Sequence, residues 1–288
     1  MKFGVFAVNQ DSGEERDGAI ESAVLAEELG FESLWATDHV VVPTRYDSVY
    51  PYSESGRMGN DVGDAFPDPL VWLAFAAAVT HRIRLATGVL VLPQRNPVVL
   101  AKQAATLDRL SGGRLTLGVG TGWLAEEFAA VGVEFAGRGR RHDDYLTAMR
   151  ELWTAQPATV HTEHVDFSAV ISRPRPVQPS IPIVIGGSGP RSVRRAALLG
   201  DGLFPAGLSV DAVEATIALL REETERAGRD QDAVPVTVQD AAQELDTFSK
   251  VVERYEAMGV ERILVSARGE DDLRKLAEGL SERFGMAE

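Results

Sequence analysis

The sequence predicts an α/β protein whose strands close into a (β/α)8 TIM barrel, with insertions at the carboxyl-terminal mouth. Short β-branched runs alternate with longer helical patterns along the whole chain, which favours parallel strands joined by right-handed helical crossovers. Eight such strands fit into the 288 residues. An open doubly wound sheet would show the same alternation. However, Gly-rich or polar clusters follow several strands, and such clusters converge at the mouth of a closed barrel.

Eight apolar runs of strand length support this architecture. They occupy residues 2–8, 33–37, 83–92, 114–118, 181–185, 202–205, 234–238 and 262–266. Between the strands, apolar residues recur at helical spacing in residues 213–220, 248–258 and 273–284, so each of these segments has one apolar face for the core. Gly259 follows the second segment and predicts the end of that helix.

Two segments are longer than a regular strand–helix unit requires. Residues 41–68, rich in Pro, Tyr, Ser, Gly and Asp, follow the second strand and are expected to form a long loop at the mouth, here called the mouth loop. Residues 134–179 separate the fourth and fifth strands and contain one predicted helix, residues 143–153, before a proline-punctuated stretch. Because no change in composition divides the chain, we expect a single domain over residues 1–288.

The composition narrows the classes of function. The chain has 29 Lys and Arg against 43 Asp and Glu, a net charge of −14, which disfavours nucleic acid and anionic membranes as partners. It has no cysteine, so cysteine nucleophiles and thiolate metal sites are excluded, and no histidine spacing predicts a metal site. The longest apolar run, residues 70–79, is about half the roughly 20 residues of a membrane helix. Without a signal-like segment, we expect a cytoplasmic protein.

The first candidate cluster ends the second strand with Asp38 and His39. Polar residues at this end of a barrel strand face the mouth. Histidine titrates near neutral pH, and a neighbouring carboxylate can hold its tautomer or raise its basicity. A histidine that bonds only to loop backbone would show the same sequence pattern, so the motif by itself leaves both interpretations open.

The second cluster places Thr87, Gly88 and Val89 in the third strand. A glycine inside a strand indicates a bulge or the close approach of a ligand. A tight contact between this strand and a helix is the alternative explanation.

The third cluster, residues 118–123, follows the fourth strand and contains Gly120, Gly122 and Trp123. It is not the dinucleotide-binding fingerprint, because Trp123 takes the position of the third glycine. The alternate glycines predict a surface without side chains against which a planar ring could lie, with Trp123 as one wall. A sharp turn with the tryptophan in the core is the alternative.

The fourth cluster places Gly186, Gly187 and Ser188 between the fifth strand and a helix. Free backbone N–H groups at a helix start, with a serine hydroxyl beside them, predict an anion site. The arginines of that helix could add positive charge or could be solvated.

Taken in this order, the four clusters resemble the bacterial-luciferase-like superfamily of flavin and deazaflavin oxidoreductases. The resemblance extends over nearly the whole chain, and the matching pieces are residues 1–6, 38–39, 86–89, 120–124, 175–178 and 185–187. The subgroup that the chain resembles most uses coenzyme F420, a deazaflavin, although close relatives use FMN. The family fold is a (β/α)8 barrel with insertions, in agreement with the strand count.

The resemblance implies specific roles for these residues. Gly88-Val89 matches a bulge with a non-proline cis peptide that backs the cofactor ring, and His39 matches a histidine near the reactive carbon of that ring. Gly186, Gly187 and Ser188 match the backbone groups that hold the cofactor phosphate. The predicted cofactor-binding set is completed by Asp38, Thr87, Gly120 and Gly122.

Trp123 departs from the family pattern, because some members carry a catalytic glutamate at that position. The departure puts general-acid chemistry there in doubt and leaves Trp123 to shape the face on which substrate stacks. Glu126, one helical turn further on, is the candidate substitute for the acid. We therefore expect His39, Trp123 and Glu126 to form the catalytic set.

The function implied by the resemblance is hydride transfer between coenzyme F420 and a small organic substrate. One alternative is an FMN-dependent monooxygenase that uses reduced flavin and oxygen, and another is a barrel that binds a flavin without turnover. Because the relatives are commonly dimers, we expect a homodimer, although no interface can be located from the sequence.

Overall fold

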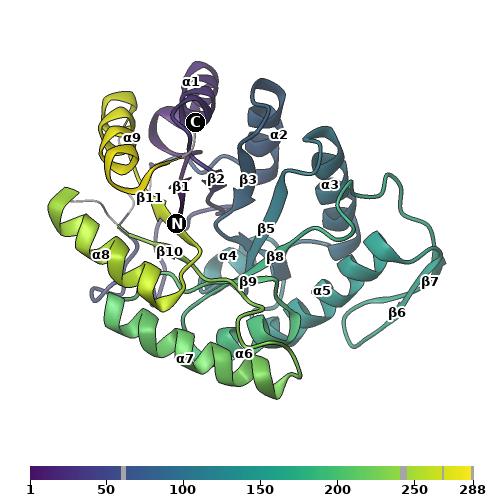
Figure 1. Ribbon diagram of the computed structural model, residues 1–288. Helices are drawn as coiled ribbons and strands as arrows, with labels where there is room; N and C mark the ends of the chain where they lie inside the picture. Colours follow the sequence, from purple (N-terminus) through teal and green to yellow (C-terminus); the bar gives the residue numbers. More distant parts are fainter. Residues whose placement is uncertain (60–62, 241–244, 268, 287–288) are drawn as a thin grey trace.

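Parallel strands form a ring at the centre of the molecule, and helices surround it (Figure 1). The computed structural model describes residues 1–59, 63–240, 245–267 and 269–286. The strand order around the ring is β10-β11-β1-β2-β3-β5-β8-β9, and an isolated parallel bridge between Leu203 and Val236 brings the two ends together. This nearly closed eight-strand barrel confirms the predicted fold.

The strands of the ring correspond to the eight predicted runs. They are β1 (Lys2–Phe6), β2 (Ser33–Ala36), β3 (Arg84–Thr87), β4 (Leu90–Val91), β5 (Leu115–Gly120), β8 (Ile183–Gly186), β9 (Gly202–Phe204), β10 (Thr237–Gln239) and β11 (Arg262–Val265). Every residue of β2, β5, β9 and β11 is buried, as expected where helices cover a parallel sheet.

Helices surround the ring of strands, and two of them, α2 and α3, begin in the same way. The helices are α1 (Arg16–Glu28), α2 (Pro69–Val79), α3 (Pro97–Leu110), α4 (Ala125–Ala130), α5 (Arg138–Thr154), α6 (Pro190–Leu199), α7 (Val210–Arg226), α8 (Leu245–Met258) and α9 (Glu270–Phe284), with short 3-10 turns at Asp11–Glu14 and Leu92–Gln94. Asp68 caps α2 and Asn96 caps α3, each accepting two backbone hydrogen bonds ahead of a proline. Proline suits this first position because an N–H there would have no acceptor within the helix, so nothing is lost when it is absent. Within the described ranges, no helix has both the length and the apolar character needed to cross a bilayer.

Side chains from different strands meet inside the ring. One buried cluster consists of Trp35, Ala86, Val184, Phe204 and Leu264, which come from five different strands. Phe6 and Val89 pack against this cluster. The barrel interior is therefore a packed core rather than a pore, and its upper surface is the floor of the site described below.

The third predicted strand is interrupted. Its two parts, β3 and β4, flank the peptide bond between Gly88 and Val89, which is cis. The family resemblance predicted both the bulge and the cis bond.

The segment between β5 and β8 contains more structure than the sequence predicted. Helix α5 begins at Arg138 rather than near residue 143, because its first turn is rich in arginine and has no apolar periodicity. An antiparallel hairpin of β6 (Ala158–His161) and β7 (Asp166–Val170) follows and projects beyond α5 (Figure 1). No residue of β7 is buried, and β6 alternates buried and exposed residues over only four positions, so neither segment gives a long enough apolar pattern to predict a strand.

Candidate functional site

A cavity of about 720 Å³ opens at the carboxyl ends of the strands. Its walls come from the last residues of β1, β4, β5, β8, β9 and β10 and from the segments that follow β1, β2, β5, β8 and β9. Enzymes with this fold place their sites at this face, and the volume lies in the range of small-molecule pockets. The predicted site residues on its walls are Asp38, His39, Gly88, Val89, Gly120, Gly122, Trp123, Gly186, Gly187 and Ser188.

His39 contacts a buried carboxylate that the sequence did not single out. Its Nδ1 lies 3.3 Å from Oε2 of Glu127, and the other oxygen of Glu127 accepts a 2.6 Å hydrogen bond from the backbone N–H of Val40. A carboxylate only accepts hydrogen bonds, so Nδ1 of a neutral imidazole carries the hydrogen here and Nε2 is an acceptor. No described residue bonds to Nε2, and the ring lines the cavity.

The surroundings of Glu127 keep it charged. Burial opposes ionisation, but the hydrogen bonds from His39 and Val40 hold the pKa of Glu127 below its ordinary value. The imidazole itself packs edge-on against Phe66 and Trp123, with ring centroids 5.1 and 6.2 Å away. Glu127 and the two aromatic rings together fix the orientation of His39.

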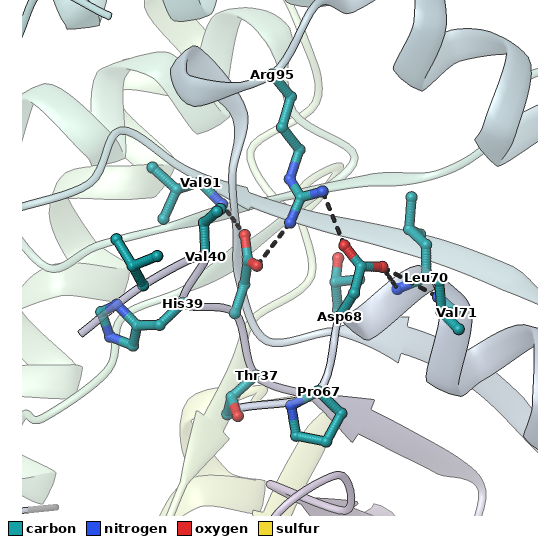
Figure 2. Close-up of polar contacts among 12 residues, drawn as sticks. Thr37, His39, Val40, Pro67, Asp68, Leu70, Val71, Val91 and Arg95 are labelled. Atoms are coloured by element: carbon teal, nitrogen blue, oxygen red, sulfur yellow. Dashed lines mark hydrogen bonds and ion pairs between the residues drawn. The ribbon is translucent and has the colours of Figure 1, made fainter. Parts of the chain in front are cut away.

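Asp38 does not contact its neighbour His39, which corrects the expectation that it would hold the imidazole. Its two carboxylate oxygens bond Nη2 of Arg95 at 2.7 Å and the N–H of Val91 at 2.9 Å. Figure 2 shows Arg95 also reaching Asp68, and the imidazole of His39 pointing away from this group. Burial raises the pKa of Asp38, while Arg95 opposes that shift.

The Asp38–Arg95–Asp68 group connects three segments of the mouth. Asp68 accepts the 3.0 Å bond from Nη1 of Arg95 with one oxygen and caps α2 with the other (Figure 2). Despite burial, the two carboxylates raise the pKa of Arg95. Asp38 is thus a structural anchor that places His39 at the end of β2, and Arg95 is a partner that the sequence analysis missed.

Glu126 and Thr87 do not line the cavity, contrary to expectation. Glu126 binds the mouth loop instead: its carboxylate accepts hydrogen bonds from the N–H of Asp47 at 2.6 Å and from Oγ of Ser48 at 2.7 Å. These bonds, that of Ser48 first, lower the pKa of Glu126 to about 2. Glu126 is therefore an anionic anchor with no proton to give near neutral pH. Thr87 is fully buried, and its hydroxyl donates to the carbonyl of Gly118.

The glycines at the ends of β5 and β8 allow close packing of neighbouring side chains, which differs from the surface without side chains that we predicted. A Cβ at Gly120 would lie 2.9 Å from the Val89 side chain, and a Cβ at Gly186 would lie 2.8 Å from it. At Gly122 a Cβ would lie 2.7 Å from Phe128. Gly120 and Gly186 thus make room for Val89, whose side chain lines the cavity together with these glycines.

The segment between β8 and α6 has the features of an anion site. Gly187, at φ +119°, Ser188 and Gly189 line the cavity just before α6. The N–H of Gly187 donates to the carbonyl of Phe204, and the N–H of Ser192 donates to the carbonyl of Gly189. Because Pro190 has no N–H, the backbone donors that the described residues leave for an anion are those of Ser188, Gly189 and Arg191. Arg138 lines the same region and donates to the carbonyl of Gly122. Burial lowers the pKa of Arg138, and the nearby positive charge of Arg191 adds to that effect. An anion bound here would offset the repulsion between the two arginines.

The mouth loop covers the cavity from above. It begins after β2 and reaches the segment after β9, where a Cβ at Gly207 would lie only 3.0 Å from the Cβ of Tyr52. β2 and β9 lie four strands apart in both directions around the ring, so the loop crosses the whole mouth. Within the described part of the chain, no group of three or more His, Asp and Glu could hold a metal ion.

Comparison with known proteins identifies relatives of this chain in sequence and in fold. An uncharacterized protein of Mycobacterium tuberculosis is 33% identical over 99% of both chains. The F420-dependent glucose-6-phosphate dehydrogenase of Kineococcus radiotolerans is 34% identical over 75% of this chain and 61% of its own.

Among solved structures, an F420-dependent secondary alcohol dehydrogenase superimposes with a TM-score of 0.80 at 17% identity, covering 100% of this chain and 99% of that one. A monooxygenase from Streptomyces bottropensis has a TM-score of 0.78 at 22% identity, covering 99% and 98%. Both show the same fold. The family model described as luciferase-like monooxygenase matches residues 1–278, and the chain belongs to this family.

Proposed function

We propose that this protein is an oxidoreductase that transfers a hydride between coenzyme F420 and a small organic substrate. The observation that carries the proposal is the His39–Glu127 pair on the wall of a cavity whose far side is the anion site at α6. F420-dependent dehydrogenases among the relatives and neighbours support a cofactor of the F420 or flavin type.

The cavity fits such a cofactor. The Gly187–Gly189 segment, the start of α6 and Arg138 would hold its phosphate, because backbone N–H groups and a guanidinium complement an anion. Val89, brought into the cavity by the interrupted third strand, would support one face of the ring system. When bound, the deazaflavin supplies two-electron chemistry as a hydride acceptor or donor.

His39 is the residue placed to move the accompanying proton. If an alcohol is the substrate, Nε2 of His39 would accept the proton of its hydroxyl, the bound deazaflavin would supply the acceptor for the hydride of its carbon, and a carbonyl compound would remain. The reverse reaction returns both. Glu127 stabilises the imidazolium that forms, because its carboxylate accepts the hydrogen on Nδ1. The mouth loop and Trp123 line the cavity on this side.

A titration of the purified protein with each cofactor tests the proposal. We expect F420 to bind with a change in its absorption and fluorescence, and bound F420 to be reduced or oxidised when substrate is added. Tight binding of FMN with oxygen consumption would favour the luciferase-type monooxygenase. Cofactor binding without turnover of any substrate would favour a non-catalytic flavin-binding barrel.

We further propose a homodimer, formed through the outer face of α2. Val71, Ala74, Phe75 and Ala78 lie at helical spacing on this face and are all exposed, Val71 at 71%. A contiguous apolar face is self-complementary across a two-fold axis. Light scattering should give twice the chain mass, and Phe75→Glu should give the monomer mass. A wild-type monomer at micromolar concentration would overturn the proposal.

A further inference from the structure

The part of the cavity under the mouth loop differs from the part beside α6 in its chemistry. Its walls are Tyr50, Pro51, Tyr52, Met58, Phe66 and Trp123, here called the aromatic wall. Trp123 is in contact with Tyr50, with ring centroids 5.0 Å apart at 68°, and Tyr50 is in contact with Tyr52 at 5.3 Å and 81°. These edge-to-face contacts are favourable arrangements of aromatic rings and hold the wall in place.

The charged side chains that line the cavity are already engaged with other groups of the protein. Among the described residues on its walls, Asp38 and Arg138 carry acid or guanidinium groups, and His39, whose neutral ring is the proton acceptor, is the one imidazole. Asp38 is neutralised by Arg95 at 2.7 Å. Arg138 bonds the carbonyl of Gly122 and lies beside Arg191, on the α6 side. The aromatic wall therefore has no cation for an anionic substrate.

The polar groups of the wall suit a neutral oxygen. Burial raises the pKa of both Tyr50 and Tyr52, so the phenols keep their protons near neutral pH. None of the described residues forms a hydrogen bond with either hydroxyl, which leaves both able to donate to a carbonyl or alcohol oxygen. The wall is half-open, with Tyr52 36% exposed, so a carboxylate or phosphate taken up here would lose part of its hydration without gaining a cation in its place.

We infer that the substrate taken up under the mouth loop is an uncharged, largely apolar alcohol or carbonyl compound, and not a sugar phosphate. This inference rests on the proposed function and adds the substrate class. It separates this chain from the glucose-6-phosphate dehydrogenases among its relatives, because a phosphate ester is best held by arginine or lysine.

A pair of alcohols that differ only in charge tests the inference. Methyl phenyl carbinol and its para-carboxylate analogue are titrated calorimetrically against the full chain with and without F420, and glucose-6-phosphate is the third probe. We expect the neutral alcohol to bind about 100-fold more tightly than the carboxylate, because the wall offers no partner for the charge. Equal or tighter binding of the carboxylate or of glucose-6-phosphate, or no binding of the neutral alcohol, would overturn the inference.

Two variants locate the effect. Val49 lines the cavity but is 73% exposed, so Val49→Lys introduces a cation at the wall without disturbing the core. It should improve carboxylate affinity about tenfold, through a charge pair at the rim. Ser53→Lys places the same charge on an exposed residue of the same loop that does not line the cavity, and it should leave the preference unchanged. An equal effect of both variants, or of neither, would contradict the assignment.

The two proposals fail separately. If F420 does not bind, the proposed function is wrong, while the preference between the charged and neutral alcohols is still read from the protein without cofactor, in a buffer with enough inorganic phosphate to occupy the anion site at α6. If F420 binds and the anionic probes are preferred, the substrate class is wrong and the proposed cofactor stands.

Discussion

Nδ1 of His39 lies 3.3 Å from Oε2 of Glu127, although 88 positions separate the two residues in the chain. His39 lies three residues after β2, and Glu127 lies in the short helix α4 that follows β5. Since the Glu127 side chain is only 2% exposed, its charge acts on the imidazole without much screening by water. The pair leaves Nε2 as the ring nitrogen available to a ligand in the cavity.

Replacing Glu127 with Gln should separate positioning from folding. The amide keeps the shape but removes the charge that stabilises a protonated His39, so we expect kcat to fall about 10- to 100-fold, with the affinity for F420 little changed. Glu223→Gln is the control, because Glu223 pairs with Arg194 outside the cavity. A lowered melting temperature with unchanged kcat would mean that Glu127 only supports the fold.

The barrel could be predicted because the alternation of strands and helices follows from local patterns. Parallel strands bring all their carboxyl ends to one face, so the Gly-rich clusters after β5 and β8 were correctly placed near Asp38 and His39. The β6–β7 hairpin was missed, since β6 alternates over only four residues and no residue of β7 is buried.

The partners of the site residues could not be predicted, because they depend on long-range packing. Glu126 and Glu127 are adjacent in α4, so their side chains point about 100° apart around the helix axis. A six-residue helix is too short for its apolar face to show which glutamate turns inward. Arg95 is 57 positions from Asp38, and many carboxylates lie at comparable separations in an acidic chain.

The Asp38–Arg95 pair should be coupled in its effect on stability. Arg95→Met leaves a buried carboxylate without its cation, and we expect a loss of about 3–5 kcal/mol in the free energy of unfolding. Asp38→Asn combined with Arg95→Met should lose less than the sum of the single variants, as a double-mutant cycle in urea would measure. Strict additivity would contradict a direct pairing.

The pH dependence of Arg95→Met follows from the sign of the Asp38 shift. Burial raises the pKa of Asp38 in the wild type, and Arg95 opposes the rise. Without Arg95 the pKa rises further, so the folded state of the variant holds a proton more tightly than the unfolded state does. The stability deficit should therefore shrink as the pH falls, and a deficit that grows on acidification would exclude this explanation.

Gly187→Val should abolish tight binding of F420. Gly187 has φ +119°, and a Cβ there would lie 2.6 Å from Oγ of Ser192 at the start of α6. The side chain would shift the segment that is proposed to hold the phosphate. Gly228→Val is the matched control, because Gly228 also has a positive φ, +74°, but an added Cβ meets nothing within 4 Å. Equal F420 affinity of the folded Gly187→Val and Gly228→Val proteins would remove the assignment.

Glu126 should make the stability of the protein depend on acid pH through the mouth loop. The hydrogen bonds from Ser48 and Asp47 lower the pKa of Glu126 from 4.5 to about 2. A carboxyl whose pKa is depressed in the folded state contributes stability above its unfolded pKa and loses it as the pH falls towards the folded value. Urea unfolding followed between about pH 5 and about pH 2 should therefore show a smaller loss for Glu126→Gln than for the wild type. Glu225→Gln is the control, because Glu225 is an exposed residue of α7 far from the loop in sequence. Parallel pH curves for the wild type and Glu126→Gln would show that the carboxylate does not anchor the loop. Curves that converge near the low end of the pH range would assign the anchor to Glu126. A change in Tyr50–Trp123 fluorescence of Glu126→Gln at neutral pH would show that the loop has lost this contact.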